Sequence, residues 1–453
     1  MPLFKICSDV KKFHPINIDR FVVKLSAMKL AKASVLILVC LAAAEFLIRG
    51  PLRANGDSTD FFLVYLTVKA LVLGLNPYSQ VDMAAALKAM GSTKITLEPF
   101  GAFRPGLYPP STYLVFAPLG YLDWDLAKNI YLVLSLLAFV LQTAVLLMLP
   151  GAERSPLKKS LIIATSLACA PIHTGISKGQ ISILANCLLI TGWFGSQRGW
   201  KILPPILFGF CGAIKPHLAI PFLAFLFVKR RWSVLVWSCL IPVALLLVSC
   251  GVLSYSTSGL NWISELRANF ADASGAAGAA SSSPENPIWY HLINMQVVLF
   301  KFTTSTSTVV ALTIIFCTAM LFWLSSLLKQ LESQDDLLLV SLLAVGGLLI
   351  CYHRFYDGGV LLLPVAWAIA SDWSKRKWDK IVVLGLCSPF LFPGAAILKI
   401  LSADGTIPSF IVSSWAWDNL ILAHQPWSLI FLFIGLMVSI RIQIRDRRAS
   451  VDS

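Results

Sequence analysis

The stretch WSVLVWSCLIPVALLLVSCGVL (residues 232–253) holds 22 residues without a single charge. A helix of that length is about 33 Å long, enough to cross the hydrocarbon core of a bilayer. Comparable apolar runs recur along most of the chain. The sequence therefore predicts an all-α, polytopic membrane protein, since a transmembrane β-barrel would show short alternating segments instead.

The overall composition supports this fold class. Of 453 residues, 57% are hydrophobic and 13% charged, whereas soluble domains have about 45–50% apolar and about 25% charged residues. An ordinary cytosolic enzyme and a disordered regulator are therefore excluded. The net charge of +14 could suggest a nucleic-acid partner. None is expected, however, because the basic residues lie between the apolar runs, as the positive-inside rule predicts for a membrane protein. The cysteines have neither disulfide nor zinc-site spacing and are expected to be small core residues.

The apolar runs predict about 12 spans, some of them too short to cross a bilayer alone. The candidates are roughly 28–48, 127–149, 159–176, 180–196, 202–214, 218–228, 232–253, 304–328, 336–351, 358–371, 380–398 and 426–441. Lys215-Pro216 separates two short runs, which form either one interrupted span or a re-entrant pair. The short run 111–122, which contains Pro118, is expected to be re-entrant or interfacial.

The basic clusters predict the sidedness. With the N-terminus inside, nearly every short basic cluster falls on one side, which the positive-inside rule makes cytoplasmic. The resulting division is a basic cytoplasmic N-terminus (1–27), a transmembrane catalytic module (28–373) with an extracytoplasmic loop (49–126), C-terminal spans (374–441) and a basic cytoplasmic tail (442–453). The N-terminus is expected to lead into an uncleaved first span.

Asp60 begins a predicted helix that follows the first span. Apolar residues recur at helical spacing as far as Leu75, which predicts a helix with one apolar face in the plane of the membrane interface. Ser58 or Thr59 can cap this helix, which places Asp60 in its first turn, where the ionised carboxylate that a general base needs is favoured. The alternative is that Asp60 only caps the helix.

Basic residues at two span ends are candidate phosphate ligands. Lys215 and His217 flank a proline at a depth where lysine normally has an anionic partner or faces a polar cavity. An internal salt bridge or a snorkelling side chain would explain Lys215 equally well. His353 and Arg354 lie in the segment Tyr352–Asp357, which could alternatively be an aromatic and basic anchor at the interface.

Three weaker signals complete the candidate set. Arg104 lies in a proline-rich loop that could aim it into a cavity, although it could also be an isolated loop arginine. Gln180 could offer its amide to a sugar hydroxyl. Asp123-Trp-Asp125 has the D-x-D spacing that holds a divalent metal in many glycosyltransferases, but capping of the helix that begins near residue 126 explains both carboxylates.

Together these segments resemble glycosyltransferase family 87, the polyprenol-phosphate-mannose-dependent α-mannosyltransferases of the GT-C superfamily. Order and spacing fit from about residue 56 to 373. Ser182 departs from the family pattern, in which asparagine is more common. The motifs are Asp60-Phe-Phe-Leu-Val-Tyr65, Gly74-Leu-Asn-Pro-Tyr78, Tyr108-Pro-Pro110, Phe116-Ala-Pro118, Gly179-Gln-Ile-Ser182, Gly212-Ala-Ile-Lys215-Pro216, Lys229-Arg-Arg-Trp232 and Tyr352-His-Arg-Phe-Tyr-Asp357.

The resemblance implies a GT-C-type bundle in the plasma membrane with an extracytoplasmic active site. The donor would be a sugar on a polyprenyl phosphate, usually mannose, and the acceptor a lipid or a glycan. Asp60 matches the catalytic base of the family. The expected donor-binding residues are Lys215, His353, Arg354, Arg104, Gln180, Tyr108 and His217.

A single base indicates inversion at the anomeric carbon, because retention needs a second nucleophilic step. Several cations beside a monophosphate leaving group can replace a metal, so no metal or other cofactor is expected. Two alternatives to this function stay open. One is a transporter or flippase for lipid-linked sugars, which the break at Lys215 would suit. The other is a GT-C enzyme that uses a different sugar or acceptor.

Overall fold

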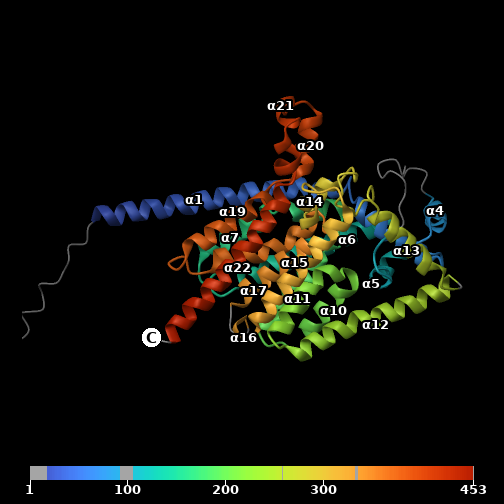
Figure 1. Ribbon diagram of the computed structural model, residues 1–453, viewed down its shortest axis with the longest axis horizontal. Helices are drawn as coiled ribbons and strands as arrows, with labels where there is room; N and C mark the ends of the chain where they lie inside the picture. The colour runs from blue at the N-terminus through green and yellow to red at the C-terminus, as the bar shows by residue number, and fades with distance from the viewer. Residues whose placement is uncertain (1–17, 92–105, 258, 332–334, 452–453) are drawn as a thin grey trace, which may run out of the picture.

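The computed structural model describes residues 18–91, 106–257, 259–331 and 335–451 (Figure 1). Within these ranges the chain is helical, and its extended pairing is limited to an isolated bridge between Leu292 and Arg354. This confirms the all-α class. The N-terminal half comprises α1 (Ile18–Arg49), α2 (Pro51–Ala54), α3 (Thr59–Val72), α4 (Gln80–Ala89), α5 (Pro110–Gly120), α6 (Trp124–Leu147), α7 (Pro156–Ala168), α8 (Ala170–Lys178), α9 (Ser182–Gln197), α10 (Leu203–Ile214), α11 (Pro216–Val228) and α12 (Trp232–Ser256).

The C-terminal half continues the bundle and adds short helical turns. Its elements are α13 (Asn261–Ser274), η3 (Trp289–His291), α14 (Met295–Leu299), α15 (Thr306–Ser326), α16 (Leu328–Leu331), α17 (Asp336–Ile350), η4 (Phe355–Leu361), α18 (Leu362–Ala370), α19 (Lys377–Cys387), η5 (Ser388–Leu391), α20 (Ala395–Ala403), α21 (Ser409–Val412), η6 (Trp417–Ile421) and α22 (His424–Val451). Because α22 runs to Val451, most of the predicted tail continues that helix.

Length and composition identify five segments in the described chain that could each cross a membrane, or seven if two bent helix pairs count as one span each. The protein is therefore a multi-pass membrane protein. The expected number of about 12 spans is not confirmed. Helices such as α10, with 12 residues, and α17, with 15 residues, are shorter than the roughly 20 residues that a simple crossing needs.

Helices α10 and α11 form a helical hairpin. Their single connecting residue, Lys215, has a non-helical backbone, because Pro216 cannot continue the helix. Arg231, just after α11, donates to Gln197 Oε1 at 3.0 Å, and Gln197 ends α9, shortly before α10 begins. The two outer ends therefore lie together, and Lys215 is the tip of the hairpin, about 18 Å from them by the length of α10.

The hydroxyls of α5 complete this tip. Ser111 Oγ donates to the carbonyl of Ala213 at 2.7 Å, and Thr112 Oγ1 donates to the carbonyl of Ile214 at 3.2 Å. Carbonyls at the end of a helix have no partner within it. The start of α5 therefore satisfies the end of α10 and lies next to Lys215.

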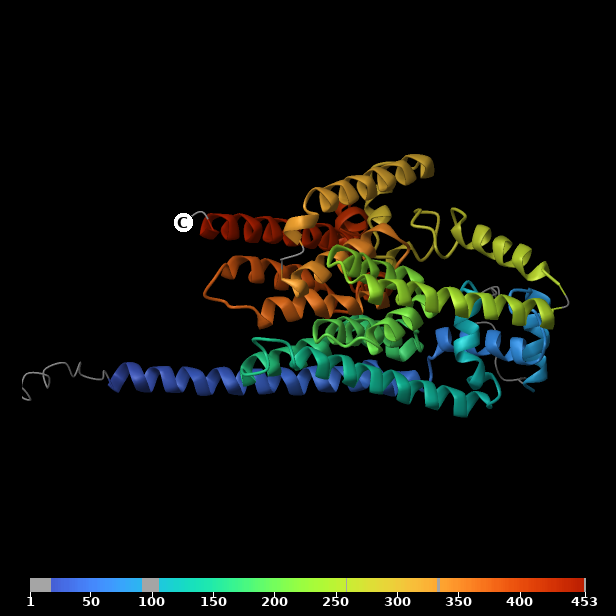
Figure 2. The ribbon, with the colours of Figure 1, turned by 90° about the horizontal axis from the view of Figure 1, so that it is seen from below.

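Helix α3 has two buried faces, so the prediction of a single apolar face is wrong. Phe62 and Leu66 belong to a cluster with Met83 of α4, whereas Phe61 and Tyr65 belong to the main core. The short α4 covers the face that was expected to be polar. In Figure 2 the blue and cyan helices of residues 59–120 gather at the end of the bundle opposite the C-terminus.

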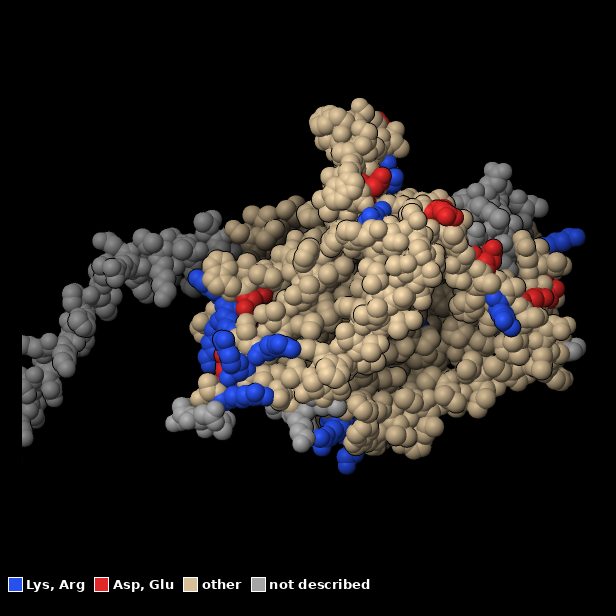
Figure 3. All heavy atoms as spheres, viewed as in Figure 1, with Lys and Arg blue, Asp and Glu red and all other residues tan. Residues whose placement is uncertain are grey.

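Basic side chains gather at the other end. Figure 3 shows lysine and arginine concentrated where α22 ends. Arg376 lies there and donates to the carbonyl of Ser439 on α22 at 3.1 Å. The two ends of the bundle thus differ in character, and the candidate site residues lie away from the basic end.

Candidate active site

Asp60 lies in the first turn of α3, half-buried, as expected. Its helix is not capped by a side chain, however. Ser58, at the N-cap position, has a left-handed backbone, and its hydroxyl donates back to the carbonyl of Ala54 at 2.7 Å. The backbone N–H of Ser58 donates to the carbonyl of Ser177 at 2.8 Å. This contact joins the start of α3 to the end of α8. The prediction that a side chain caps α3 is wrong, because the Ser58 hydroxyl binds the carbonyl of Ala54 instead.

Gln180 is the hydrogen-bond partner of the Asp60 carboxylate. Its Nε2 donates to Asp60 Oδ2, and its Oε1 accepts from the Tyr108 hydroxyl at 3.4 Å. Gly179 allows this approach: its φ is +69°, and a Cβ there would lie 2.5 Å from the Cβ of Phe61. Gln180, expected to meet a sugar hydroxyl, thus orients the proposed base.

Asp357 joins the other candidate residues. It is 1% exposed and pairs through Oδ1 with the ammonium of Lys215 and with Ser182 Oγ, the latter at 2.6 Å. Its Oδ2 lies 3.1 Å from His353 Nδ1 and 3.3 Å from the backbone N of Arg354. Lys215 therefore has the internal salt bridge that was its alternative interpretation. Ser182, the departure from the family pattern, is part of this network.

Local structure explains how these residues meet. Asp357 is in the first turn of η4, three residues after Arg354, and accepts the Arg354 N–H as part of a capping box. The antiparallel bridge from Leu292 to Arg354, together with the bond from the Ile293 N–H to the carbonyl of His353 at 3.0 Å, fixes the backbone on the other side. His353 and Arg354 are thus held by main-chain contacts from both directions.

Three buried nitrogens at this site have no hydrogen-bond partner among the described residues. They are His353 Nε2, His217 Nε2 and Arg354 Nε. The rings of His217 and His353 lie 4.8 Å apart. Because a carboxylate can only accept, Asp357 holds the proton of His353 on Nδ1 and leaves Nε2 unpaired. Buried polar groups without partners are rare, so these nitrogens are candidates for binding a ligand.

The negative charge of Asp60 acts on two other residues of the site, Tyr108 and Arg354. Burial, with Asp60 and Asp357 nearby, raises the pKa of Tyr108 well above its usual range, so its hydroxyl remains a donor. Burial, with Arg354 and then Lys178 nearby, lowers the pKa of His291 to about 4. Arg354 is the permanent cation here, since arginine keeps its proton in proteins.

The remaining acidic candidates have structural partners. Asp57 is 2.7 Å from the ammonium of Lys178. Asp123 caps α6 by accepting the Leu126 N–H at 2.9 Å, and Asp125 is 3.6 Å from the ammonium of Lys128. Asp123 therefore has the role that the capping interpretation predicts, whereas Asp125 lies in the first turn of α6 and pairs with Lys128 instead of capping the helix.

Arg104 lies outside the described residues.

His217, His353 and Asp357 could together hold a metal ion, since their ligand atoms lie within 4.8 Å of one another. The Lys215 ammonium already pairs with the same Asp357 carboxylate. A divalent cation would have to bind beside that positive charge, which opposes binding.

Sequence reasoning did not include Asp357 and Ser182 among the site residues. One signal was present: Asp357 is four residues after His353, a spacing that lets two side chains meet in a helical turn. The contacts of Asp357 with Lys215, 142 residues away, and with Ser182, 175 residues away, leave no local pattern.

A half-buried carboxylate and buried cationic groups, gathered at one end of an apolar helical bundle, are the kinds of group that acid–base chemistry on an anionic substrate requires. The comparison with protein families specifies it further. The model of glycosyltransferase family 87 matches residues 107–364, more than half of the chain. The chain therefore belongs to glycosyltransferase family 87 and is a membrane glycosyltransferase.

The matched region contains Tyr108, Gln180, Lys215, His217, His353 and Arg354 but begins after Asp60. No curated protein and no solved structure matches the chain.

Proposed function

We propose that the protein transfers a sugar, with mannose first in order of expectation, from a polyprenyl-phosphate donor to a lipid or glycan acceptor. The reaction takes place on the extracytoplasmic face of the plasma membrane. Membership in family 87 supports the transferase class. The polyprenyl chain would lie among the apolar helices, which suits a multi-pass enzyme. The observation that carries the proposal is the half-buried Asp60 carboxylate, whose charge acts on Arg354, in a site where Arg354 Nε and His353 Nε2 are buried without a partner in the described chain.

In this reaction the acceptor oxygen attacks the anomeric carbon while Asp60 takes the hydroxyl proton. The bond from that carbon to the phosphate oxygen breaks on the opposite side, and the phosphate leaves with the electron pair. One displacement inverts the anomeric configuration. Gln180 supports the base, because its amide fixes the Asp60 carboxylate through Oδ2 and leaves Oδ1 for the acceptor proton.

The leaving phosphate would be bound by Arg354 and His353. Arg354 Nε is a buried donor and His353 Nε2 a buried ring nitrogen, and neither has a partner in the described chain. Lys215 contributes differently from the first expectation: its charge is balanced by Asp357, so it fixes the carboxylate that positions His353. His217 borders His353 and would shape the same subsite.

We further propose that the transfer needs no metal. Phosphate charge would be balanced by Arg354, while Asp123 and Asp125 are engaged in capping and pairing. The protein should keep its activity after dialysis against EDTA. Loss of activity that returns with a divalent cation would contradict this and direct attention to His217, His353 and Asp357.

The decisive experiment incubates the purified protein with polyprenyl-phosphate-mannose and candidate lipid acceptors and follows the products by mass spectrometry. Transfer with release of polyprenyl phosphate supports the proposal. A parallel series with other polyprenyl-phosphate sugars tests the preference for mannose. Movement of intact donor across a vesicle bilayer, without transfer, would instead support the flippase alternative.

A further inference from the structure

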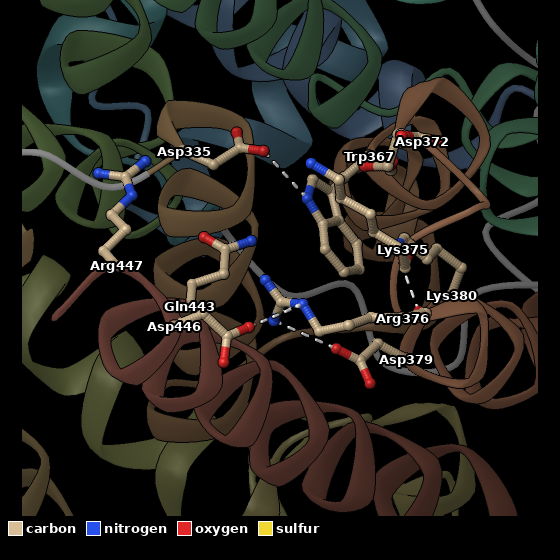
Figure 4. Close-up of a pocket in the computed structure, with 11 residues that line it drawn as sticks. Asp335, Trp367, Asp372, Lys375, Arg376, Asp379, Lys380, Gln443, Asp446 and Arg447 are labelled. Carbon is tan, nitrogen blue, oxygen red and sulfur yellow. Dashed lines mark hydrogen bonds and ion pairs between the residues drawn. The ribbon is translucent and has the colours of Figure 1, made fainter. Parts of the chain in front are cut away.

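A cavity lies at the basic end of the bundle, away from the candidate active site. It has a volume of about 650 Å³. Its walls come from the start of α17, the end of α18, the start of α19 and the end of α22, and the side chains that line it point into it from these elements (Figure 4). None of the active-site residues lines this cavity, so it needs its own explanation.

The lining holds four basic and four acidic side chains, so net charge alone selects no ligand. The partners of the individual acidic groups indicate which kind of ligand the cavity can bind. Asp379 and Asp446 lie 3.5 and 3.8 Å from the guanidinium of Arg376. Asp335 accepts the Trp367 indole N–H at 3.3 Å and caps α17 with its other oxygen. Asp372, the fourth carboxylate, is exposed and accepts from the backbone N–H and the hydroxyl of Ser374, at 2.9 Å each. All four carboxylates are therefore already engaged.

Two ammonium groups at the cavity contrast with these carboxylates. Lys380 is 5% exposed, and its ammonium donates only to the carbonyls of residues 375 and 376. Lys158 donates to the carbonyls of residues 370 and 371, at 2.7 and 2.9 Å, and residue 371 is part of the cavity wall. Neither lysine forms an ion pair within the described chain. Asp379 and Asp372 act on Lys380 only at longer range, and the charges of Arg376 and Lys158 oppose them.

An ammonium has three donors, so each lysine has one left after its two carbonyl bonds. An ammonium group that is shielded from water and has no ion-pair partner is unfavourable. An anion that contacts both lysines would supply that partner. Lys375 stands exposed at the rim as a further cation. Basic pockets between spanning helices suit the phosphate of a lipid headgroup, because the helices end where the headgroups lie.

We infer that this cavity binds a phosphate group, presented by the headgroup of an anionic membrane lipid. Lys380 contacts the phosphate from the cavity wall and Lys375 from the rim, and Lys158 reaches it from beside Ser371, a wall residue. This site is separate from glycosyl transfer and does not depend on the proposed function.

The test measures binding to the purified full chain. Dioctanoyl phosphatidic acid, dioctanoylglycerol and inorganic phosphate are titrated separately, and the thermal unfolding midpoint and native mass spectra are recorded. Phosphatidic acid should raise the midpoint and remain bound, whereas dioctanoylglycerol, which lacks the phosphate, should not. If inorganic phosphate binds as tightly as phosphatidic acid, the phosphate site stands and its source is soluble. Equal effects of dioctanoylglycerol and phosphatidic acid would overturn the inference.

Variants locate the site. Lys158→Gln and Lys375→Gln should each weaken phosphatidic acid binding by about tenfold, the size expected for a hydrogen bond between charged groups. Lys201→Gln, an exposed lysine outside the cavity, is the matched control and should bind as the wild type. Lys375 is exposed, so its loss does not threaten folding. Wild-type affinity in both cavity variants would show that the lipid binds elsewhere.

Discussion

Asp60 and Asp357 occupy neighbouring parts of one site but have opposite surroundings. Asp60 is half-buried, and its described hydrogen bond comes from the neutral amide of Gln180. Asp357 is almost fully buried and pairs with Lys215, Ser182, His353 and a backbone N–H. A carboxylate with a free oxygen can accept a proton, whereas one with every oxygen engaged holds other groups in place. The difference supports the proposed role of Asp60 as the base and gives Asp357 the role of holding its neighbours in position.

The largest expected effect is on activity at Asp60. Asp60→Asn keeps the shape of the side chain but removes the charge and the proton-accepting oxygen. Transfer should fall by about 10²- to 10⁴-fold, the usual contribution of a general base, while donor binding and the unfolding midpoint change little. Rates from mass spectrometry and thermal scans measure the two effects.

Asp57→Asn and Asp123→Asn are the controls and should keep most of their activity. Both residues are acidic and close in sequence or space, but they pair with Lys178 and cap α6. Transfer by Asp60→Asn within a few-fold of wild type would end the proposed mechanism. A dead Asp123→Asn variant would move the chemistry to the D-x-D pair.

At Asp357 the main effect should be on stability. Asp357→Asn leaves the buried Lys215 ammonium without its counter-charge, which costs about 3–5 kcal/mol of unfolding free energy. The double variant Lys215→Met, Asp357→Asn removes both charges and should recover much of that loss, since the two effects are coupled. Denaturant or thermal unfolding of the four proteins in the cycle measures this.

Asp379→Asn is the matched control for this cycle. Its pair with Arg376 is partly solvent-exposed, with atoms 3.5 Å apart, and such pairs contribute about 0–1 kcal/mol. If Asp357→Asn is as stable as Asp379→Asn, the carboxylate does not hold the site together.

A smaller effect is expected at Arg354. Arg354→Gln removes the permanent cation from the phosphate subsite, and donor affinity should fall by roughly tenfold or somewhat more, because a hydrogen bond to a charged group contributes about 1.5–3 kcal/mol. A titration with polyprenyl phosphate, the leaving group alone, isolates this effect from catalysis. Unchanged affinity for polyprenyl phosphate would place the phosphate elsewhere.

The smallest effect should be at Ser182. Ser182→Ala removes one neutral donor to Asp357 and should lower the unfolding free energy by about 1 kcal/mol, with activity reduced only slightly. Ser182→Asn, the more common family residue, can donate to the same carboxylate and should lie nearer to wild type. A large loss of activity in Ser182→Ala would show that Asp357 acts in the reaction. The proposed difference in role between Asp357 and Asp60 would then not hold.

The parts of the fold that depend on local signals could be predicted from the sequence. The proline after Lys215 predicted the break, and the position of Asp123 predicted the cap on α6. The buried second face of α3 could not be predicted, because α4 (Gln80–Ala89) is short and mixed in composition. The span count could not be confirmed for the same kind of reason: apolar composition does not distinguish a short buried helix from a crossing one.

In the site, Asp60 was placed correctly because a helix start is a local feature. The partner of Lys215 could not be identified, since it lies 142 residues away and only packing brings the two together. The positions of His353 and Arg354, two proposed donor-binding residues, could be predicted from the segment Tyr352–Asp357. Only the main-chain bridge from Arg354 to Leu292 shows how they are held.

The separation between Lys215 and Asp357 also has a consequence for biosynthesis. At ordinary rates of chain elongation, roughly 7–30 s pass between the addition of these two residues. For that time the tip of the hairpin carries a lysine without its counter-charge, which disfavours its final depth in the membrane. The α10–α11 hairpin is therefore expected to reach its final position late, after α12, α15 and α17 have been synthesised and η4 has brought Asp357 to it.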